Sequence, residues 1–122
     1  KVRKDLEEKG WTVTKWLNNV DLEKKEIIPA KRKFNPFNKV MTIGTGFPDF
    51  LAFQRVGEFF NIIGVESKVN GTLSKEEKEK CAWLLENKIF NHIWISNKNE
   101  SGKVEYVNFK ERFSKFLKDE NN

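Results

Sequence analysis

Hydrophobic positions in this sequence recur with two different spacings, one typical of strands and the other of helices. Runs rich in aromatic and β-branched residues predict strands over 11–17, 47–54, 59–69, 89–96 and 104–107. A wider spacing predicts a helix over 2–9 that Gly10 ends, and further helices over 74–88 and 109–117. Strands and helices interleave along the chain, which predicts an α/β fold.

The helix predicted over 74–88 has the clearest start signal of the three. Ser74 and Glu77 have the spacing of a capping box, in which both side chains accept hydrogen bonds from N–H groups at the helix start. Leu84, Leu85 and Ile89 then supply an apolar side. We therefore expect an amphipathic helix that begins at Ser74.

The segment 18–46 is rich in Asn, Pro and Gly, which predicts a long irregular connection. A connection of this length in a compact domain is usually functional. Residues 1–43 carry 11 lysines and arginines against 6 acidic residues, so they account for the whole net charge of +5. The densest basic run, residues 31–39, lies inside this connection and is interleaved with aromatic residues.

Basic side chains mixed with aromatic ones are typical of surfaces that bind nucleic acid, because cations neutralise phosphates and rings stack on exposed bases. We therefore expect nucleic acid as a partner. The predicted contacts to its backbone are Lys15, Lys31, Arg32, Lys33 and Arg55. A second interpretation stays open, in which 31–39 is a solvated basic loop that places Phe34 and Phe37 in the core.

Length and composition limit the classes of protein that remain. The 122 residues are enough for one domain, predicted over 1–122 with a frayed tail at 118–122. The single cysteine, Cys81, excludes an intramolecular disulfide and a cysteine-based zinc site. No apolar run could span a membrane and no secretory signal opens the chain, so we expect a cytoplasmic protein, nucleoid-associated or viral, without a membrane partner.

The strand predicted over 59–69 carries charged residues inside an otherwise apolar stretch. Side chains alternate along a strand, so Gly64, Glu66 and Lys68 share one face. The opposite face, predicted to be the core side, holds Ile63, Val65, Ser67 and Val69. Charges in such a place cost stability unless they have a functional partner.

A second carboxylate reaches the same patch from the preceding strand. A short turn joins the strand at 47–54 to the next one, which predicts an antiparallel hairpin. Counting back from the turn places Asp49 opposite residues 65–66. The carboxylates of Asp49 and Glu66 are therefore expected to meet, and Gly64 is expected to leave room beside them for a ligand.

Two adjacent carboxylates supply the oxygen ligands that Mg²⁺ and Mn²⁺ prefer, so Asp49 and Glu66 are the predicted metal ligands. The backbone carbonyl of Ser67 is the candidate third ligand. A bound metal polarises a phosphate and lowers the pKa of a bound water. Lys68 has two roles that the sequence does not separate: it can lie close to that water and give up a proton when its pKa is depressed, or it can act as a fixed positive charge beside the reacting phosphate.

Three motifs together resemble the PD-(D/E)XK nuclease superfamily. They are Gly46-Phe-Pro48-Asp49, Glu66-x-Lys68 and Leu73-Ser-Lys-Glu-Glu77, and they are most similar to the VRR-NUC and archaeal Holliday-junction-resolvase-like branches. The resemblance implies a central mixed β-sheet flanked by α-helices, the restriction-endonuclease-like core. It also implies a DNA substrate, a divalent metal held by Asp49 and Glu66, and Lys68 as the catalytic lysine.

Two features differ from the superfamily pattern. Glu77 stands where many relatives carry glutamine, and its spacing from Ser74 favours a capping role over an accessory role in the site. Many relatives also carry an acidic residue in the first helix, at a position that would precede Lys1. Glu7 and Glu8 are interpreted as solvated helix charges.

Other residues give weaker functional signals. His92, the single histidine, lies in an apolar strand and is interpreted as structural, and Cys81 lacks a partner motif for a thiol nucleophile. The remaining alternative for the charged patch is a surface ion pair between Glu66 and Lys68, beside a hairpin aspartate.

The sequence therefore predicts a divalent-metal-dependent DNA nuclease. We expect an endonuclease that hydrolyses phosphodiester bonds of duplex or branched DNA, as a junction resolvase does. A symmetric homodimer is expected, because a resolvase must cut two strands. Two alternatives stay open: a catalytically inactive nucleic-acid-binding domain with the same fold, and a nuclease module of a larger DNA-processing protein.

Overall fold

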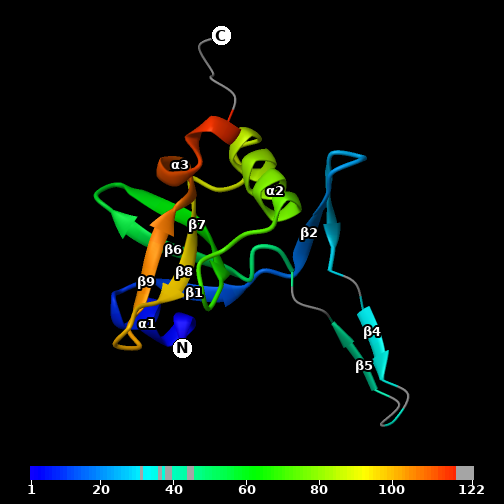
Figure 1. The fold of residues 1–122 in the computed structure, drawn as a ribbon, viewed down its shortest axis with the longest axis horizontal. Helices are drawn as coiled ribbons and strands as arrows, with labels where there is room; N and C mark the ends of the chain where they lie inside the picture. The colour runs from blue at the N-terminus through cyan, green and yellow to red at the C-terminus, as the bar shows by residue number, and fades with distance from the viewer. Residues whose placement is uncertain (31, 36, 38–39, 44–45, 118–122) are drawn as a thin grey trace.

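A five-stranded mixed sheet organises the computed structural model, with its strands in the order β1-β6-β7-β8-β9 (Figure 1). These strands are β1 (Thr12–Lys15), β6 (Phe50–Val56), β7 (Phe59–Ser67), β8 (His92–Lys98) and β9 (Val104–Asn108). In this sheet β7 and β8 pair in parallel, and the other neighbours pair antiparallel. The structure describes residues 1–30, 32–35, 37, 40–43 and 46–117. The predicted α/β class with a mixed sheet is confirmed.

The helices lie on both sides of this sheet. They are α1 (Val2–Glu8), α2 (Lys75–Glu86), the short α3 (Phe109–Arg112) and the 3₁₀ turn η1 (Ser114–Phe116). The helix predicted over 109–117 is too long, because Phe113 leaves the helical conformation and packs its ring 4.9 Å from that of Phe109. The predicted tail 118–122 lies outside the described residues. Within the described ranges, no helix is long and apolar enough to cross a membrane.

The segment 18–46 is not the irregular connection that its composition predicts. It forms two hairpins, β2 (Asn18–Asp21) with β3 (Glu26–Pro29), and β4 (Arg32–Asn35) with β5 (Val40–Ile43) (Figure 1). The Asp21 carboxylate accepts hydrogen bonds from the backbone N–H groups of Glu23 and Lys24, each at 3.0 Å. This local capping closes a tight turn that polar composition alone does not distinguish from an irregular loop.

The core divides into two clusters, one on each face of the sheet. The cluster on the α1 face contains Val2, Leu6, Val13, Ala52, Ile63 and Val65. The larger cluster on the α2 face includes Phe47, Leu84, Phe90, Ile93, Ile95 and Phe109. The expectation that β7 has a single core side is therefore wrong, because this central strand is covered on both faces. Two residues assigned to that core side, Ser67 and Val69, are exposed where the strand ends.

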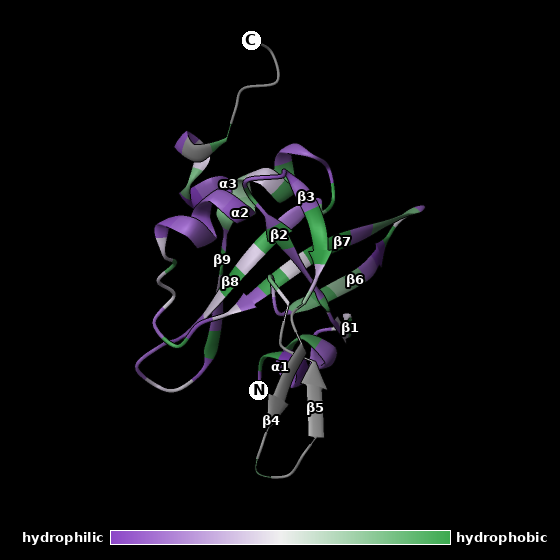
Figure 2. Ribbon diagram, turned by 90° about the vertical axis from the view of Figure 1, so that its right-hand side faces the viewer, coloured by the Kyte–Doolittle hydropathy of each residue, from purple (hydrophilic) through white to green (hydrophobic). Residues whose placement is uncertain are grey.

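The β6–β7 hairpin extends beyond its neighbours in the sheet (Figure 2). Pairing with β1 ends at Phe53, and the bonds to the β8 side begin at Ile62, so the strand residues between these limits pair only within the hairpin. This projecting part carries the exposed hydrophobic side chains of Val56, Phe59 and Phe60, and Ile62 at its base is also exposed. The predicted turn near residue 57 is confirmed.

Gly64 fills a packing role rather than the ligand-binding role expected of it. A Cβ atom at this position would lie 2.6 Å from Pro48 Cγ and 3.3 Å from the Phe90 ring. The space above Gly64 is therefore occupied by Pro48 and Phe90. This close approach holds the segment that leads into Asp49 against β7.

We expect Gly64→Ala to lower the free energy of unfolding by about 1–3 kcal/mol, the usual cost of overpacking a core. The midpoint of urea unfolding measures this loss. Asn61→Ala, an exposed position on the same strand, should change the free energy by less than about 0.5 kcal/mol. Equal effects of the two substitutions would contradict the packing role of Gly64.

Candidate active site

The register of the β6–β7 hairpin brings the two predicted carboxylates together. Phe50 pairs with Val65, so the next position outward sets Asp49 against Glu66, as residue counting predicts. The Asp49 backbone N–H donates to Glu66 Oε1 at 3.1 Å, and the Ser67 N–H donates to Asp49 Oδ2 at 2.9 Å. The two strands therefore exchange side-chain-to-backbone hydrogen bonds where their regular pairing ends.

Glu66 is buried, with only 6% of its surface exposed, so its ion pair with Lys68 does not lie on the surface. It lies on the α2 face between Gly64 and the strand end, beside Ile95 of the parallel strand. Burial raises the pKa of Glu66 to about 8, and the nearby Asp49 carboxylate adds to this rise. Burial likewise raises the pKa of Asp49 above its ordinary value.

Lys68 contacts two carboxylates from different elements. Its Nζ lies 2.7 Å from Glu77 Oε2 and 3.6 Å from Glu66 Oε2. The Lys68 backbone N–H also donates to Ser96 Oγ at 3.2 Å, which fixes this residue just beyond the end of β7. The ammonium group thus lies between the buried glutamate and the first turn of α2.

Glu77 combines the capping and accessory roles that the sequence presents as alternatives. The Ser74 N–H donates to Glu77 Oε1 at 2.9 Å, and the Glu77 N–H donates to Ser74 Oγ at 3.1 Å, which completes the capping box. The other oxygen of Glu77 accepts the hydrogen bond from Lys68. One carboxylate therefore caps α2 and positions the candidate catalytic lysine.

The contact with Glu77 also bears on the two roles considered for Lys68. The hydrogen bond that the Lys68 ammonium donates to Glu77 raises the pKa of Lys68 above its ordinary value, despite partial burial. The same contact helps to hold the pKa of Glu77 below its ordinary value, although burial opposes this. An ammonium group with a raised pKa does not readily give up its proton near neutral pH, so the geometry favours a fixed positive charge.

The donor atoms of Asp49 and Glu66 fit a hard divalent cation, because all of them are carboxylate oxygens. Burial raises the pKa of both carboxyls, and the Asp49 charge raises that of Glu66 further, so a proton or a cation stabilises the pair. Among the described residues, no group of three His, Cys, Asp or Glu side chains converges as a metal cage. Mg²⁺ commonly keeps several waters and uses one or two carboxylates, so the pair is sufficient.

The predicted DNA contacts divide between different parts of the fold. Lys15 follows Val13 on the α1 face, opposite the face of Asp49 and Glu66. Arg55 lies on the same face as Asp49, near the tip of the projecting hairpin, with its guanidinium 5.7 Å from the centre of the Phe60 ring. Arg32 and Lys33 belong to β4, and Lys31 lies outside the described residues.

His92 and Cys81, the two weaker candidates, lie in structural surroundings. His92 Nδ1 lies 3.1 Å from Asn108 Nδ2 on the neighbouring strand, and burial lowers the pKa of His92. Cys81 is fully buried in α2, which raises the pKa of its thiol. These surroundings agree with the structural interpretation of both residues.

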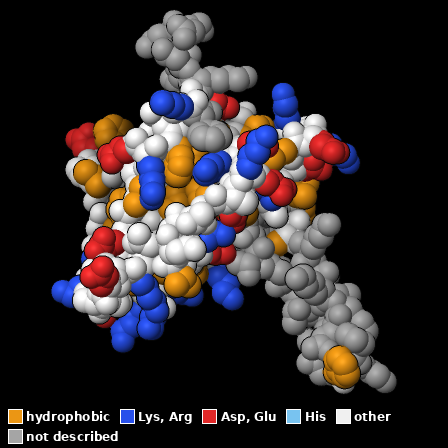
Figure 3. All heavy atoms as spheres, viewed as in Figure 1, with side chains coloured by type: hydrophobic (Ala, Val, Ile, Leu, Met, Phe, Trp, Pro, Cys, Tyr) orange, Lys and Arg blue, Asp and Glu red, His pale blue; other side chains and the backbone are white. Residues whose placement is uncertain are grey.

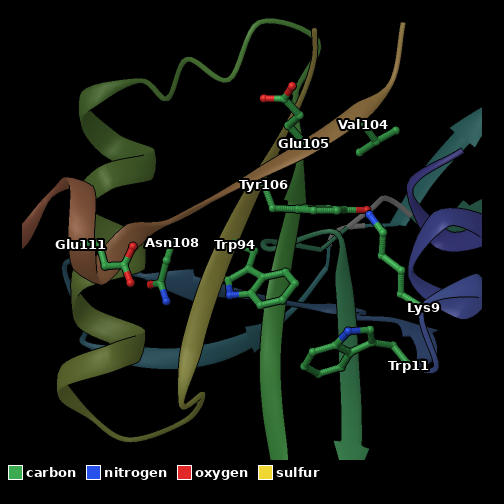
Figure 4. Close-up of a pocket in the computed structure, with 8 residues that line it drawn as sticks. All are labelled: Lys9, Trp11, Trp94, Val104, Glu105, Tyr106, Asn108 and Glu111. Atoms are coloured by element: carbon green, nitrogen blue, oxygen red, sulfur yellow. The ribbon is translucent and has the colours of Figure 1, made fainter.

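A groove with a volume of about 650 Å³ lies away from the charged patch, on the α1 side of the sheet (Figure 4). Trp11, Trp94 and Tyr106 pack edge-on or tilted against one another along it, and Lys9 Nζ lies 5.2 Å from the centre of the Tyr106 ring. The aromatic rings contact each other rather than enclosing a gap. The groove shares no residue with the charged patch, so size alone does not identify the candidate site.

Comparisons with known proteins do not assign this chain to a family, so a functional proposal has to rest on the site. No protein-family model, no curated protein and no solved structure matches this chain. The superfamily resemblance therefore rests on the three motifs and on the way the fold places them. Of those motifs, the aspartate, the glutamate, the lysine and the start of α2 all meet at one end of β7.

We expect the metal-free protein to lose stability as the pH rises from about 4.5 to about 8, because Glu66 has a higher pKa folded than unfolded. Its stabilising contribution is complete below the unfolded value and is lost as the pH rises through the folded value. The loss should be a few kcal/mol, at about 1.4 kcal/mol per pKa unit. Glu66→Gln should flatten this profile in urea unfolding with EDTA.

Glu58→Gln, in the exposed hairpin turn, serves as the matched control and should keep the wild-type profile. Added Mg²⁺ should raise the stability of the wild type at pH 8 and leave that of Glu66→Gln nearly unchanged. Parallel pH profiles for the wild type and Glu66→Gln would show that burial does not perturb this carboxyl.

Proposed function

We propose that this chain is a divalent-metal-dependent DNA nuclease that hydrolyses phosphodiester bonds, as an endonuclease of duplex or branched DNA. One observation carries the proposal: a buried glutamate contacts an aspartate of the neighbouring strand and a lysine held by the next helix. Stability alone does not favour two desolvated carboxylates side by side. A bound cation would offset this cost through its attraction to the carboxylates, and a polyanionic substrate would in turn be attracted to the cation.

Asp49 and Glu66, with the Ser67 carbonyl, would hold Mg²⁺ or Mn²⁺. When bound, the metal supplies positive charge to the scissile phosphate and makes a coordinated water more acidic. The Ser67 N–H orients the Asp49 carboxylate, and the Asp49 N–H orients that of Glu66. Each ligand is therefore positioned by the backbone of the opposite strand before any metal arrives.

Lys68 provides a fixed positive charge for the negative charge that develops on the phosphate during water attack. Glu77 holds its ammonium group at 2.7 Å and keeps it protonated, so the lysine does not need to exchange a proton during the reaction. Because Glu77 also caps α2, the position of this charge depends on the start of the helix. The arrangement of the site is thus coupled to the stability of α2.

The face of the hairpin that carries Asp49 and Glu66 is the proposed contact surface for DNA. Along this face, Phe53 and Ile62 and then Arg55 and Phe60 follow toward the tip. The distance from Glu66 to Phe60 is about 20 Å at the usual rise along a strand. Arg55 is therefore placed to contact a phosphate several nucleotides from the cleavage position. The homodimer expected from the sequence stays a prediction.

We expect the protein to cut at least one of three labelled substrates, a four-way junction, a linear duplex or single-stranded DNA, when Mg²⁺ or Mn²⁺ is present. EDTA should abolish cutting. Asp49→Asn should lower the cleavage rate by about a hundredfold or more, because it weakens the metal site while keeping an acceptor for the Ser67 N–H.

Glu23→Gln, in the exposed β2–β3 turn, serves as the control and should cut at the wild-type rate. Circular dichroism checks that Asp49→Asn is folded. A folded protein that binds DNA but cuts none of the substrates with either metal would overturn the nuclease and favour the nucleic-acid-binding alternative. Cutting that persists in EDTA would overturn the metal-dependent mechanism.

We expect Arg55→Ala to weaken DNA binding by about five- to tenfold at 0.1 M salt, the effect of losing one phosphate contact. Lys15→Ala removes one exposed charge from the opposite face and should leave affinity unchanged. Fluorescence anisotropy of a labelled duplex in EDTA measures both. A loss of affinity in Lys15→Ala alone would place DNA on the α1 face instead.

A further inference from the structure

A second, smaller cavity opens directly beside the candidate active site. It has a volume of about 250 Å³ and lies where β7 and β8 end. Ser67 and Lys68 line it, so two residues of the candidate site form one of its walls. Ligands commonly bind outside the carboxyl ends of parallel strands, and β7 and β8 are the parallel pair of this sheet.

The lining of this cavity is positively charged. Lys1, Lys68 and Lys98 line it together with the hydroxyl-bearing Ser67 and Ser96, and no carboxylate lines it. Lys68 already forms ion pairs with Glu66 and Glu77. Within the described part of the chain, neither Lys1 nor Lys98 forms a salt bridge. The cavity therefore holds two positive charges without a neutralising partner.

Lys1 and Lys98 also contact each other. The side-chain hydrogen bond with Lys1 lowers the pKa of Lys98 below its ordinary value, and repulsion between the two ammonium groups adds to this effect. Ser96 Oγ accepts the Lys68 N–H, so the Ser96 hydroxyl proton remains free to donate. Two ammonium groups and a hydroxyl donor around one small space form a site for an oxyanion.

The positive surface continues outside the cavity. A neighbouring groove shares Lys1 with it and is also lined by Lys4, Lys9 and Lys103, against two acidic residues. Figure 3 shows lysine and arginine side chains gathered at this end of the molecule, over α1 and the β8–β9 turn. An extended cationic surface of this kind favours a phosphate within a polyanion over an isolated anion.

We propose that this cavity binds a phosphate group of nucleic acid adjacent to the scissile phosphate, with Lys98 and Lys1 as its cationic contacts. The inference rests on the proposed function, since it takes the position of the reacting phosphate from Asp49, Glu66 and Lys68. It adds two contacts that the sequence pattern does not indicate. Their role is to position the DNA strand, and they do not take part in the chemical step.

We expect Lys98→Ala to weaken binding of a labelled duplex in EDTA by about five- to tenfold at 0.1 M salt, with a matching decrease of about 1 in the slope of log K against log salt. Lys1→Ala should have a similar effect. Lys24→Ala, in the exposed β2–β3 turn, is the matched control. Because Lys98 is exposed, its substitution should leave urea unfolding unchanged.

The outcomes separate this inference from the nuclease itself. Weaker DNA binding in Lys98→Ala, with a normal Lys24→Ala control, supports phosphate binding in the cavity even if the wild type cuts no DNA. Unchanged affinity and salt slope overturn the cavity assignment even if the wild type cuts efficiently. A titration with inorganic phosphate, followed by the NMR amide signals of Ser67 and Lys98, distinguishes binding of a free anion from binding of a phosphate within nucleic acid. Phosphate binding without any effect on DNA affinity would overturn the nucleic-acid assignment.

Discussion

The contact between Asp49 and Glu66 across the β6–β7 hairpin is the constraint on which the candidate site depends. It exists because the hairpin register places the last position before β6 against the eighth residue of β7. A shift of one residue would turn Glu66 to the α1 face and separate the pair. The register is in turn held by apolar residues on both faces, Ala52 and Ile63 on the α1 face and Leu51 on the α2 face, so core packing fixes the position of the two carboxylates.

The site also connects three elements that are distant in the sequence. Lys68 follows β7, Glu77 belongs to the first turn of α2, and Ser96 lies in the parallel strand β8. Glu77 contacts the ammonium group of Lys68, and Ser96 contacts its backbone N–H. Since the capping box and the Lys68 contact share one carboxylate, helix formation and the position of the ammonium group are physically linked.

Local patterns predicted what depends on near neighbours in the chain. The capping box at Ser74 and Glu77, the hairpin turn and the pairing of Asp49 with Glu66 all follow from spacing over a few residues or from simple counting. The error at Gly64 occurred because distant segments decide the outcome there. Gly64 looked like space for a ligand, and it is filled by Pro48 and Phe90, which approach from other parts of the fold.

The sequence by itself determined the α/β class, the two carboxylates and the lysine, because periodicity and residue chemistry are local properties. Only the tertiary structure decided that Glu66 is buried, that Glu77 holds Lys68, and that Lys15 and Arg55 lie on different faces. Burial and the approach of side chains depend on which elements cover a strand, and here α2 covers one face of β7 while α1 covers the other. Such coverage is a property of the whole fold, so no short stretch of sequence encodes it.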